Sequence, residues 1–308
     1  MTDTQAVRVA FTETLLKLAR EDETLFAVAT DSRGSVTLTD FADQLPGQFV
    51  ECGIAEQDAI GVSAGLANAG ARPFVCGPAC FYSLRSAEQV KVDVAYSHAN
   101  VKIIGVSGGV SYGALGSTHH ATQDIALMRA IPGIEVYLPA DGPQMVALTK
   151  YLAKSDHPAY VRMGRGPVPT IYGENAPLIP GKANRLRQGG DASVIACGEM
   201  VYPALQAAML LDAEGIHVSV YDMFTVKPLD EAAILEAAET GLVVTVEEHN
   251  VHGGLGSAVA EVLCQRKPTK MCILGLPDEK LYTGDSAQVF AHYGLTAEGI
   301  ARAVRGDR

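Results

Sequence analysis

Short apolar runs alternate with helical patterns along most of the chain, and this alternation constrains the fold more than any other feature. A run that is apolar along its whole length is typical of a parallel strand covered by helices on both faces. The sequence therefore predicts an α/β protein with mainly parallel sheets flanked by helices. The expected strands are Leu25–Thr30, Pro73–Gly77, Val101–Ser107, Ile134–Leu138, Ala159–Arg162, Ala192–Cys197, His217–Tyr221, Leu242–Glu247 and Met271–Leu274.

The segments between these runs have apolar residues at the spacing of one helix face. The expected helices are Val7–Arg20, Ala55–Ala69, Ala87–Ser97, Ile125–Ala130, Pro143–Lys154, Tyr202–Glu214, Glu231–Thr240, Leu255–Cys264 and Ala297–Val304. The alternation stops once, between Gly164 and Gly190, where four prolines and six glycines accompany no regular period. We therefore expect two α/β domains at residues 1–165 and 190–308, joined by a linker at 166–189.

Composition excludes several functional classes. The net charge of −11 and the absence of a long Lys/Arg run argue against nucleic acid as the main partner, although a local basic pocket remains compatible. No apolar stretch is long enough for a transmembrane helix, and the acidic N-terminus does not resemble a signal peptide. The six cysteines lack paired C-x-x-C spacing, so we expect reduced thiols, a cytoplasmic location and no metal site.

Two segments in the first half place reactive groups directly after expected strands. Glu56 lies in the first turn of an apolar helix, where an acid is also favoured by the helix dipole alone. Phe81 and Tyr82 follow the run Pro73–Gly77, at the end of a parallel strand where such folds bind ligands, but they could equally cover the core.

Two further segments could contact a ligand. The glycine-rich stretch 108–120 ends in His119 and His120, and its glycines would let the backbone approach a ligand closely. Arg162 and Arg165 stand where the last strand of the first domain ends, and they could bind a phosphate or simply be solvated. The sequence contains no Walker loop, dinucleotide-binding fingerprint, H-E-x-x-H or G-x-S-x-G motif.

Taken in order, these segments resemble the transketolase family of thiamine diphosphate enzymes over nearly the whole chain. The matching stretches are FVECGIAEQD, FYSLRSAEQVKVDVA, IPGIEVYLPADG, AYVRMGR, VVTVEEHNVHGGLGSAVAEVL and YGLTAEGIARAV. Each stretch alone is moderately specific, whereas the ordered set is strongly so. The resemblance implies a pyrimidine-binding domain followed by a transketolase C-terminal domain.

The resemblance also implies roles in cofactor binding. Glu56 matches the glutamate whose carboxyl group contacts N1′ of the aminopyrimidine ring, a catalytic position that requires a group able to exchange a proton. Tyr82 matches the aromatic residue that stacks on this ring, with Phe81 beside it. Arg85 and Gln89 belong to the same cofactor segment.

The resemblance is less consistent at the positions that bind substrate in the family. Arg8, Ser35 and Arg165 match positions that hold a sugar phosphate, and His119, which we assign to catalysis and substrate binding, matches a position that is histidine or glutamine in the family. Two residues depart from the family pattern: Leu115 replaces an aspartate that reads a donor hydroxyl, and Ser107 replaces a histidine. The substrate is therefore expected to differ from the standard pentose phosphates, or to be read differently.

The chain lacks the Gly-Asp-Gly motif with which the family's pyrophosphate domain holds the metal and the diphosphate. The IAEQ stretch begins only about fifty residues from the N-terminus, which leaves no room for that domain before it. The resemblance thus implies the C-terminal half of a split transketolase, active only with an N-terminal subunit. That partner would hold Mg²⁺ or another divalent ion, in an α2β2 heterotetramer.

We therefore expect an enzyme subunit that transfers a two-carbon ketol unit between phosphorylated sugars. A deoxyxylulose phosphate synthase-like reaction is the nearest alternative, and Arg8 and Ser35 favour transketolase over it. The beta subunit of a 2-oxoacid dehydrogenase has a similar architecture, but the IAEQ and TAEGIA stretches favour transketolase. A non-catalytic regulatory subunit would not need the carboxyl group of Glu56.

Overall fold

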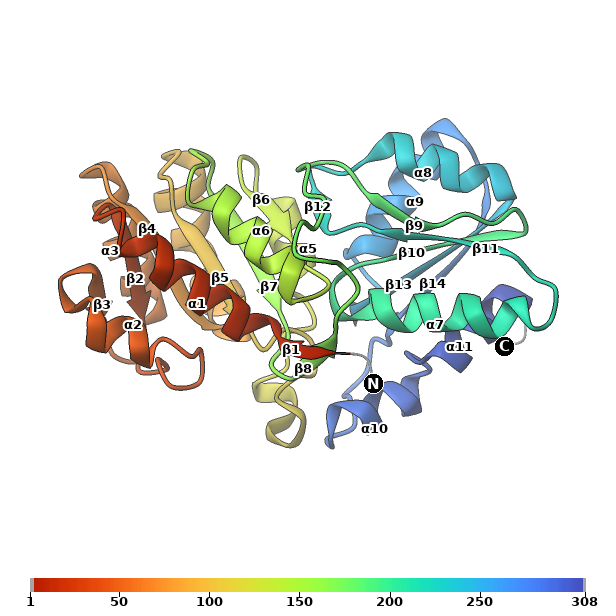
Figure 1. Cartoon of the computed structure of the whole chain (residues 1–308), viewed down its shortest axis with the longest axis horizontal. Helices are drawn as coiled ribbons and strands as arrows, with labels where there is room; N and C mark the ends of the chain where they lie inside the picture. The colour runs from red at the N-terminus through yellow and green to blue at the C-terminus, as the bar shows by residue number, and fades with distance from the viewer. Residues whose placement is uncertain (1–2, 307–308) are drawn as a thin grey trace.

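The computed structural model describes residues 3–306, and a seven-stranded sheet dominates its N-terminal half (Figure 1). The strand order across this sheet is β12-β6-β7-β5-β4-β2-β3, and all neighbours are parallel except β12, which is antiparallel to β6. The bounds are β2 (Leu25–Ala29), β3 (Phe49–Glu51), β4 (Arg72–Pro78), β5 (Lys102–Val106), β6 (Glu135–Tyr137), β7 (Ala159–Met163) and β12 (Thr225–Lys227).

Helices cover both faces of this sheet because successive strand residues point to opposite sides. Ala27 and Ala29 of β2 pack with α1 (Val7–Ala19) and α6 (Gly142–Leu152). Val28 packs on the other face with α3 (Glu56–Asn68) and α5 (Asp124–Ala130). The continuous apolar strands seen in the sequence are therefore buried on both sides, as predicted.

The C-terminal half has a five-stranded sheet of order β14-β13-β10-β11-β9, parallel except for β9. The bounds are β9 (Asn184–Arg187), β10 (Ala192–Ala196), β11 (Val218–Asp222), β13 (Leu242–Asn250) and β14 (Lys270–Leu276). One face carries α7 (Val201–Asp212) and α11 (Ala297–Arg305), and the other carries α8 (Glu231–Ala237) and α9 (Leu255–Arg266). The fold class expected from the sequence, two mainly parallel sheets flanked by helices, is confirmed.

The two halves share both a sheet and a core. Strand β12 belongs to the C-terminal half of the sequence but lies beside β6 in the first sheet, which Figure 1 shows near the centre of the molecule. One apolar cluster continues from Ile125 and Leu138 of the first half to Met223 and Leu255 of the second. The two halves are therefore packed against each other through buried apolar surface.

The structure differs from the sequence prediction mainly in short elements. All nine expected strands and the expected helices are present with ends shifted by up to three residues, except that the helix at 87–97 consists of α4 (Ala87–Gln89) followed by a π-helical stretch, Val90–Tyr96. The segment 166–189 is not without regular structure, because β8 (Pro167–Pro169) pairs with β1 (Thr4–Ala6) and β9 pairs with β11. Helices α2 (Thr39–Gln44) and α10 (Ser286–Tyr293) are additional. The pairings of β8 with β1 and of β9 with β11 each depend on a strand distant in sequence, which the local composition of 166–189 does not indicate.

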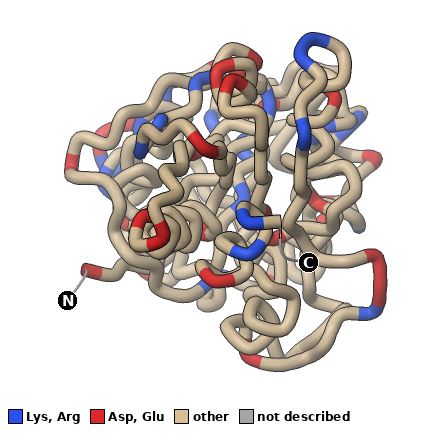
Figure 2. The backbone as a smooth tube through the Cα atoms, turned by 90° about the vertical axis from the view of Figure 1, so that its right-hand side faces the viewer, with Lys and Arg blue, Asp and Glu red and all other residues tan. Residues whose placement is uncertain are grey.

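Charges are mixed over the backbone. Figure 2 shows segments with Lys or Arg interspersed with segments with Asp or Glu, without a continuous basic stripe over the described residues. Among the described residues, none of the helices is long and apolar enough to cross a membrane.

Candidate active site

The residues singled out in the sequence gather at one edge of the seven-stranded sheet. Each of five parallel strands, β2, β3, β4, β5 and β7, is followed at its carboxyl end by a segment that carries one of them. The carboxyl ends of parallel strands lie at the same edge, where α/β proteins bind ligands. The strand order thus brings together residues that are up to about 160 positions apart.

Glu56 is buried at the first turn of α3, with 2% of its surface exposed. Its Oε2 accepts a hydrogen bond from Nη1 of Arg85 at 2.6 Å, and the Arg85 side chain is 45% exposed. Asp58 lies in the same helical turn but is solvent-exposed, so a helix-dipole role alone would not require a buried acid. Glu56 is thus a desolvated carboxyl group with one partner that can move toward solvent.

The two adjacent aromatic residues have different environments. The Tyr82 side chain is fully buried, lies against Gly77, and its hydroxyl is 3.3 Å from Oγ1 of Thr30. Phe81 is half-buried, and the guanidinium of Arg85 lies 4.3 Å from its ring centroid. In this conformation the ring of Phe81 is partly exposed, whereas the ring of Tyr82 is not.

A row of aromatic rings continues from Phe81. The ring of His119 is in edge contact with Phe81 and with Tyr112, at 5.4 Å between centroids in both pairs. The guanidinium of Arg165 lies 5.2 Å from the Tyr112 centroid. Tyr112 connects the histidine to the arginine, a role that sequence analysis missed because the residue lies in a loop without periodicity.

Two arginines end this row. Strand β1 pairs with β8 so that Ala6 lies opposite Pro167, which brings Arg8 close to Arg165, and burial and this neighbouring positive charge lower the pKa of Arg8. Arg8 donates a hydrogen bond to the backbone carbonyl of Ser35. In the part of the chain that the structure describes, neither Arg8 nor Arg165 forms an ion pair with a carboxylate. Two adjacent cations without a carboxylate partner are suited to a doubly charged anion such as phosphate.

The backbone around this edge is strained. Asp31 and Thr37, on either side of Ser35, have φ of 54° and 61°, and Ser107 at the end of β5 has φ of 59°. Such left-handed conformations are costly for residues other than glycine and occur preferentially at functional sites. The carboxylate of Glu51 stabilises the backbone at Asp31 by accepting a hydrogen bond from its N–H at 2.7 Å.

Three other candidate residues are buried or have a buried polar atom. Arg162 is buried and paired with Asp124, so it cannot bind phosphate together with Arg165. His120 is buried, and its Nε2 is 3.2 Å from the carbonyl of Gly113. Oε1 of Gln89 is buried without a hydrogen-bond partner among the described residues.

The two residues that depart from the family pattern also differ from each other. Leu115 is 55% exposed on the loop that carries His119. The hydroxyl of Ser107 is buried without a hydrogen-bond partner among the described residues. Only Leu115 therefore presents its side chain at the surface of the candidate site.

The cysteines do not form a second site. All six are free thiols, and burial raises the pKa of Cys80 to about 12. Over residues 3–306, no group of three or more His, Cys, Asp and Glu side chains could hold a metal ion.

Two family profiles match the chain in the order of its two halves. "Transketolase, pyrimidine binding domain" matches residues 3–170, and "Transketolase, C-terminal domain" matches residues 181–300. The first match includes all the residues of the candidate site: Arg8, Glu56, Phe81, Arg85, Tyr112, His119 and Arg165.

Similar proteins match over nearly their full length. The chain is 56% identical over 299 residues to one of the subunits of the apulose-4-phosphate transketolase of Phocaeicola vulgatus, covering 96% of both chains. It is 39% identical to a subunit of the 6-deoxy-6-sulfo-D-fructose transketolase of a Clostridium species, covering 96% of this chain and 92% of the relative. A solved structure titled as an inactive beta4 tetramer of a split gene transketolase is 37% identical, with a TM-score of 0.90 and coverage of 99% and 98%.

Proposed function

We propose that this chain, which belongs to the transketolase family, is one subunit of a two-subunit transketolase that transfers a two-carbon ketol unit between phosphorylated sugars. Both full-length relatives described above are named as transketolase subunits. This similarity favours ketol transfer over the deoxyxylulose phosphate synthase-like reaction and over a 2-oxoacid dehydrogenase subunit. The observation that carries the proposal is the buried carboxyl group of Glu56 at the end of the aromatic row.

The residues around Glu56 fit the pyrimidine half of thiamine diphosphate. A buried carboxyl group can exchange a proton with a ring nitrogen, and only its Oε2 is occupied by Arg85. The partly exposed ring of Phe81 and the unsatisfied Oε1 of Gln89 supply a stacking surface and a hydrogen-bond acceptor. When bound, thiamine diphosphate supplies the carbon nucleophile that attacks the ketose carbonyl. Glu56 would hold and return the proton at N1′ of the pyrimidine ring, a role that glutamine could not perform.

Tyr82 remains a candidate for stacking only if the segment rearranges. Its ring is fully buried and contacts Gly77, and the turn Phe81–Arg85 that carries it is π-helical. A π-helical turn is wider than an α-helical one and is frequent at functional sites. We therefore assign the stacking surface to Phe81 in the conformation described and keep Tyr82 as the alternative.

The other end of the row fits the substrate. Arg8 and Arg165 would bind the phosphate of a ketose, with Ser35 beside them. His119, whose Nδ1 is 2.9 Å from the hydroxyl of Thr118, would contact the sugar hydroxyls between the two ends. An exposed leucine at position 115 cannot hydrogen-bond a donor hydroxyl as an aspartate would.

The partner subunit would complete the cofactor site. This chain lacks a Gly-Asp-Gly motif and, among its described residues, a cluster of metal ligands, so the diphosphate and its divalent ion are assigned to the partner. Four apolar side chains near the Glu56 helix are solvent-exposed: Ile54 (76%), Leu84 (55%), Val92 (44%) and Tyr96 (82%). Exposed apolar side chains gathered in one region are typical of an interface. We propose that this patch binds the partner in a cytoplasmic α2β2 assembly, with domains at 1–165 and 190–308.

The test is calorimetry and a coupled ketol-transfer assay on the purified chain, with and without its partner. Alone, the chain should transfer no ketol unit and bind thiamine diphosphate weakly and independently of Mg²⁺, because the diphosphate would have no ligands. With the partner, it should use ketose phosphates from a panel of donors. Full activity of the isolated chain, or no activity of the pair with any ketose phosphate, would contradict the proposal.

A further inference from the structure

The loop that carries His119 is held from the other half of the molecule. Four glycines at positions 108, 109, 113 and 116 give this loop wide backbone freedom. The backbone N–H of Val110 donates to Oε1 of Glu248 at 2.7 Å, and its carbonyl accepts from the hydroxyl of Ser286 at 3.1 Å. The C-terminal half therefore satisfies both backbone polar groups of a residue in the site loop.

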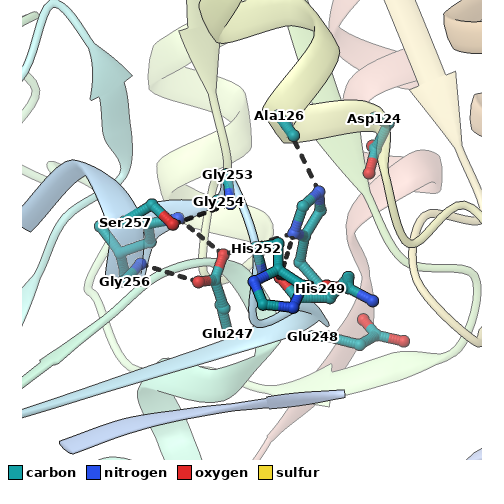
Figure 3. A network of polar contacts seen from close by, with 12 residues as sticks. Asp124, Ala126, Glu247, Glu248, His249, His252, Gly253, Gly254, Gly256 and Ser257 are labelled. Carbon is teal, nitrogen blue, oxygen red and sulfur yellow. Dashed lines mark hydrogen bonds and ion pairs between the residues drawn. The ribbon is translucent and has the colours of Figure 1, made fainter. Parts of the chain in front are cut away.

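Glu248 is itself fixed between parts of the two halves. It lies on β13 and is only 3% exposed. Nη2 of Arg162 donates to the backbone carbonyl of Glu248 at 2.6 Å and lies 3.4 Å from its Oε2, while Nε of Arg162 lies 3.2 Å from Asp124. Figure 3 shows Glu247 and Glu248 leaving the strand on opposite sides, with Glu248 on the side of Asp124.

The loop has no space to move independently of this pair. A Cβ atom on Gly109 would lie 2.1 Å from Cδ of Glu248 and 2.4 Å from Nη2 of Arg162. A Cβ on Gly113 would lie 2.7 Å from the carbonyl of Gly284. The loop backbone is thus in direct contact with the carboxylate, the arginine and the segment before α10, so displacing any of them would shift the loop.

We propose that Glu248 is a positioning residue for the reaction site: by binding the backbone of Val110 from across the domain boundary, it keeps His119 between Phe81 and Tyr112. Glu248 has no contact with the row of rings or with the phosphate-binding arginines, so it acts through the loop. This inference rests on the proposed function, because it takes the row as the reaction site. It gives the C-terminal domain an indirect role in substrate binding, exerted through the loop 108–119.

The test compares Glu248→Met with Glu248→Gln in the full chain assembled with its partner. Methionine keeps the side-chain length but removes both acceptors, whereas glutamine keeps one oxygen for the Val110 N–H. We expect hydrogen exchange of residues 108–119 to accelerate about tenfold or more in the methionine variant and to stay near the parent rate in the glutamine variant. The kcat/KM for a ketose phosphate should fall about 10- to 100-fold in the methionine variant and be largely rescued by glutamine.

Glu261→Met is the matched control. Glu261, which is 62% exposed, also forms an ion pair with an arginine across the domain boundary, Arg129 at 2.9 Å, and among the described residues no hydrogen bond or ion pair joins it to the loop 108–119. This variant should leave loop exchange and kcat/KM within about threefold of the parent.

An unchanged rate of hydrogen exchange in residues 108–119 of Glu248→Met would overturn the proposal. Equal acceleration of exchange in residues 108–119 and in the distant helix α9 would also overturn it, because it would indicate global destabilisation. Equal losses in the glutamine and methionine variants would also overturn it. Failure of the proposed function is distinguishable, because the parent pair would then transfer no ketol unit while the exchange comparison still reports on the loop.

Discussion

At the scale of single residues, the site depends on a few side chains whose surroundings differ sharply. Glu56 is a carboxyl group almost without solvent contact, and Arg85, its partner, is nearly half exposed. At the other end of the row, Arg8 and Arg165 are two cations without a carboxylate partner in the described chain. The acid and the cations therefore define opposite ends of a site that fits a cofactor ring at one end and an anion at the other.

Glu56→Gln should fold normally and lower the turnover of the reconstituted pair by on the order of 10³-fold or more, because an amide cannot exchange the proton. Steady-state ketol-transfer kinetics measure the effect, and circular dichroism checks the fold. Glu88→Gln is the control, because Glu88 is an exposed carboxylate on α4, directly after the π-helical turn that ends at Arg85. A turnover within tenfold of the parent would disprove the assignment of Glu56.

Arg165→Ala should mainly raise KM for phosphorylated ketoses, by about 10- to 100-fold, because the loss of one charged hydrogen bond costs about 1.5–3 kcal/mol. The arginine lies above the Tyr112 ring and next to Arg8, so the phosphate would keep one cation. The same kinetics with the unphosphorylated ketose provide the comparison. An equal loss with both sugars would mean that Arg165 does not bind the phosphate.

At the scale of elements, buried polar links connect the two sheets. Asp222, at the end of β11, is fully buried and accepts hydrogen bonds at 2.6 Å from Gln144 of α6 and from the Tyr172 hydroxyl. Tyr172 lies in the segment between the two sheets. One carboxyl group thus joins an element of each half to the connection between them, which is consistent with the shared apolar core.

This link predicts a pH dependence of stability. Burial raises the pKa of Asp222 to about 7, so the folded protein takes up a proton that the unfolded chain has already lost above about pH 4. The contribution of Asp222 to the free energy of unfolding should therefore fall as pH rises from about 4 to about 7, by up to about 4 kcal/mol. Burial also raises the pKa of Glu199 to about 7 and of Glu248 to about 8, so Asp222→Asn should show a smaller decrease than the parent and not lose it entirely.

Urea unfolding of the parent and of Asp222→Asn between pH 5 and pH 8 measures the difference. Asp230→Asn is a suitable control, because Asp230 is also a buried carboxyl group that accepts hydrogen bonds, but it caps α8 and, among the described residues, has no hydrogen bond to α6. Identical pH slopes for the parent and Asp222→Asn would show that this carboxyl group does not ionise differently in the folded state.

At the scale of the whole molecule, exposed apolar side chains occur in both halves. Ile54, Leu84, Val92 and Tyr96 all belong to the first half, close to the helix that carries Glu56. Outside this group, the exposed large apolar residues in the described chain are Leu115, Ile179, Met209, Leu210 and Tyr282, and Met209, at 65%, lies on α7 of the second half. We propose the first group as the face on which a partner completes the cofactor site, because it lies beside the helix that carries Glu56.

Tyr96→Arg should weaken assembly with the partner by about tenfold or more, because a charge would be buried at the interface without a counter-ion. The dissociation constant from analytical ultracentrifugation of the mixed subunits reports this change. Met209→Arg introduces the same charge on the other half and should leave assembly unaffected. If both variants assemble like the parent, the partner binds elsewhere.

The sequence by itself determined the fold class, because strands buried on both faces must be apolar throughout and helices must be amphipathic. It also identified Glu56, Phe81, Arg85 and His119 as candidates, because each lies in a stretch that resembles one family. These are local properties, and they can be read without knowing what any residue contacts.

Only the tertiary structure decided which of these residues meet. It placed Tyr82 in the core and Phe81 at the surface, joined Tyr112 to the row, separated Arg162 from Arg165, and brought Glu248 to the site loop from 138 residues away in the chain. It also added β12 of the second half to the first sheet. The physical reason is that burial and long-range hydrogen bonds depend on the packing of segments distant in sequence, which no local pattern encodes.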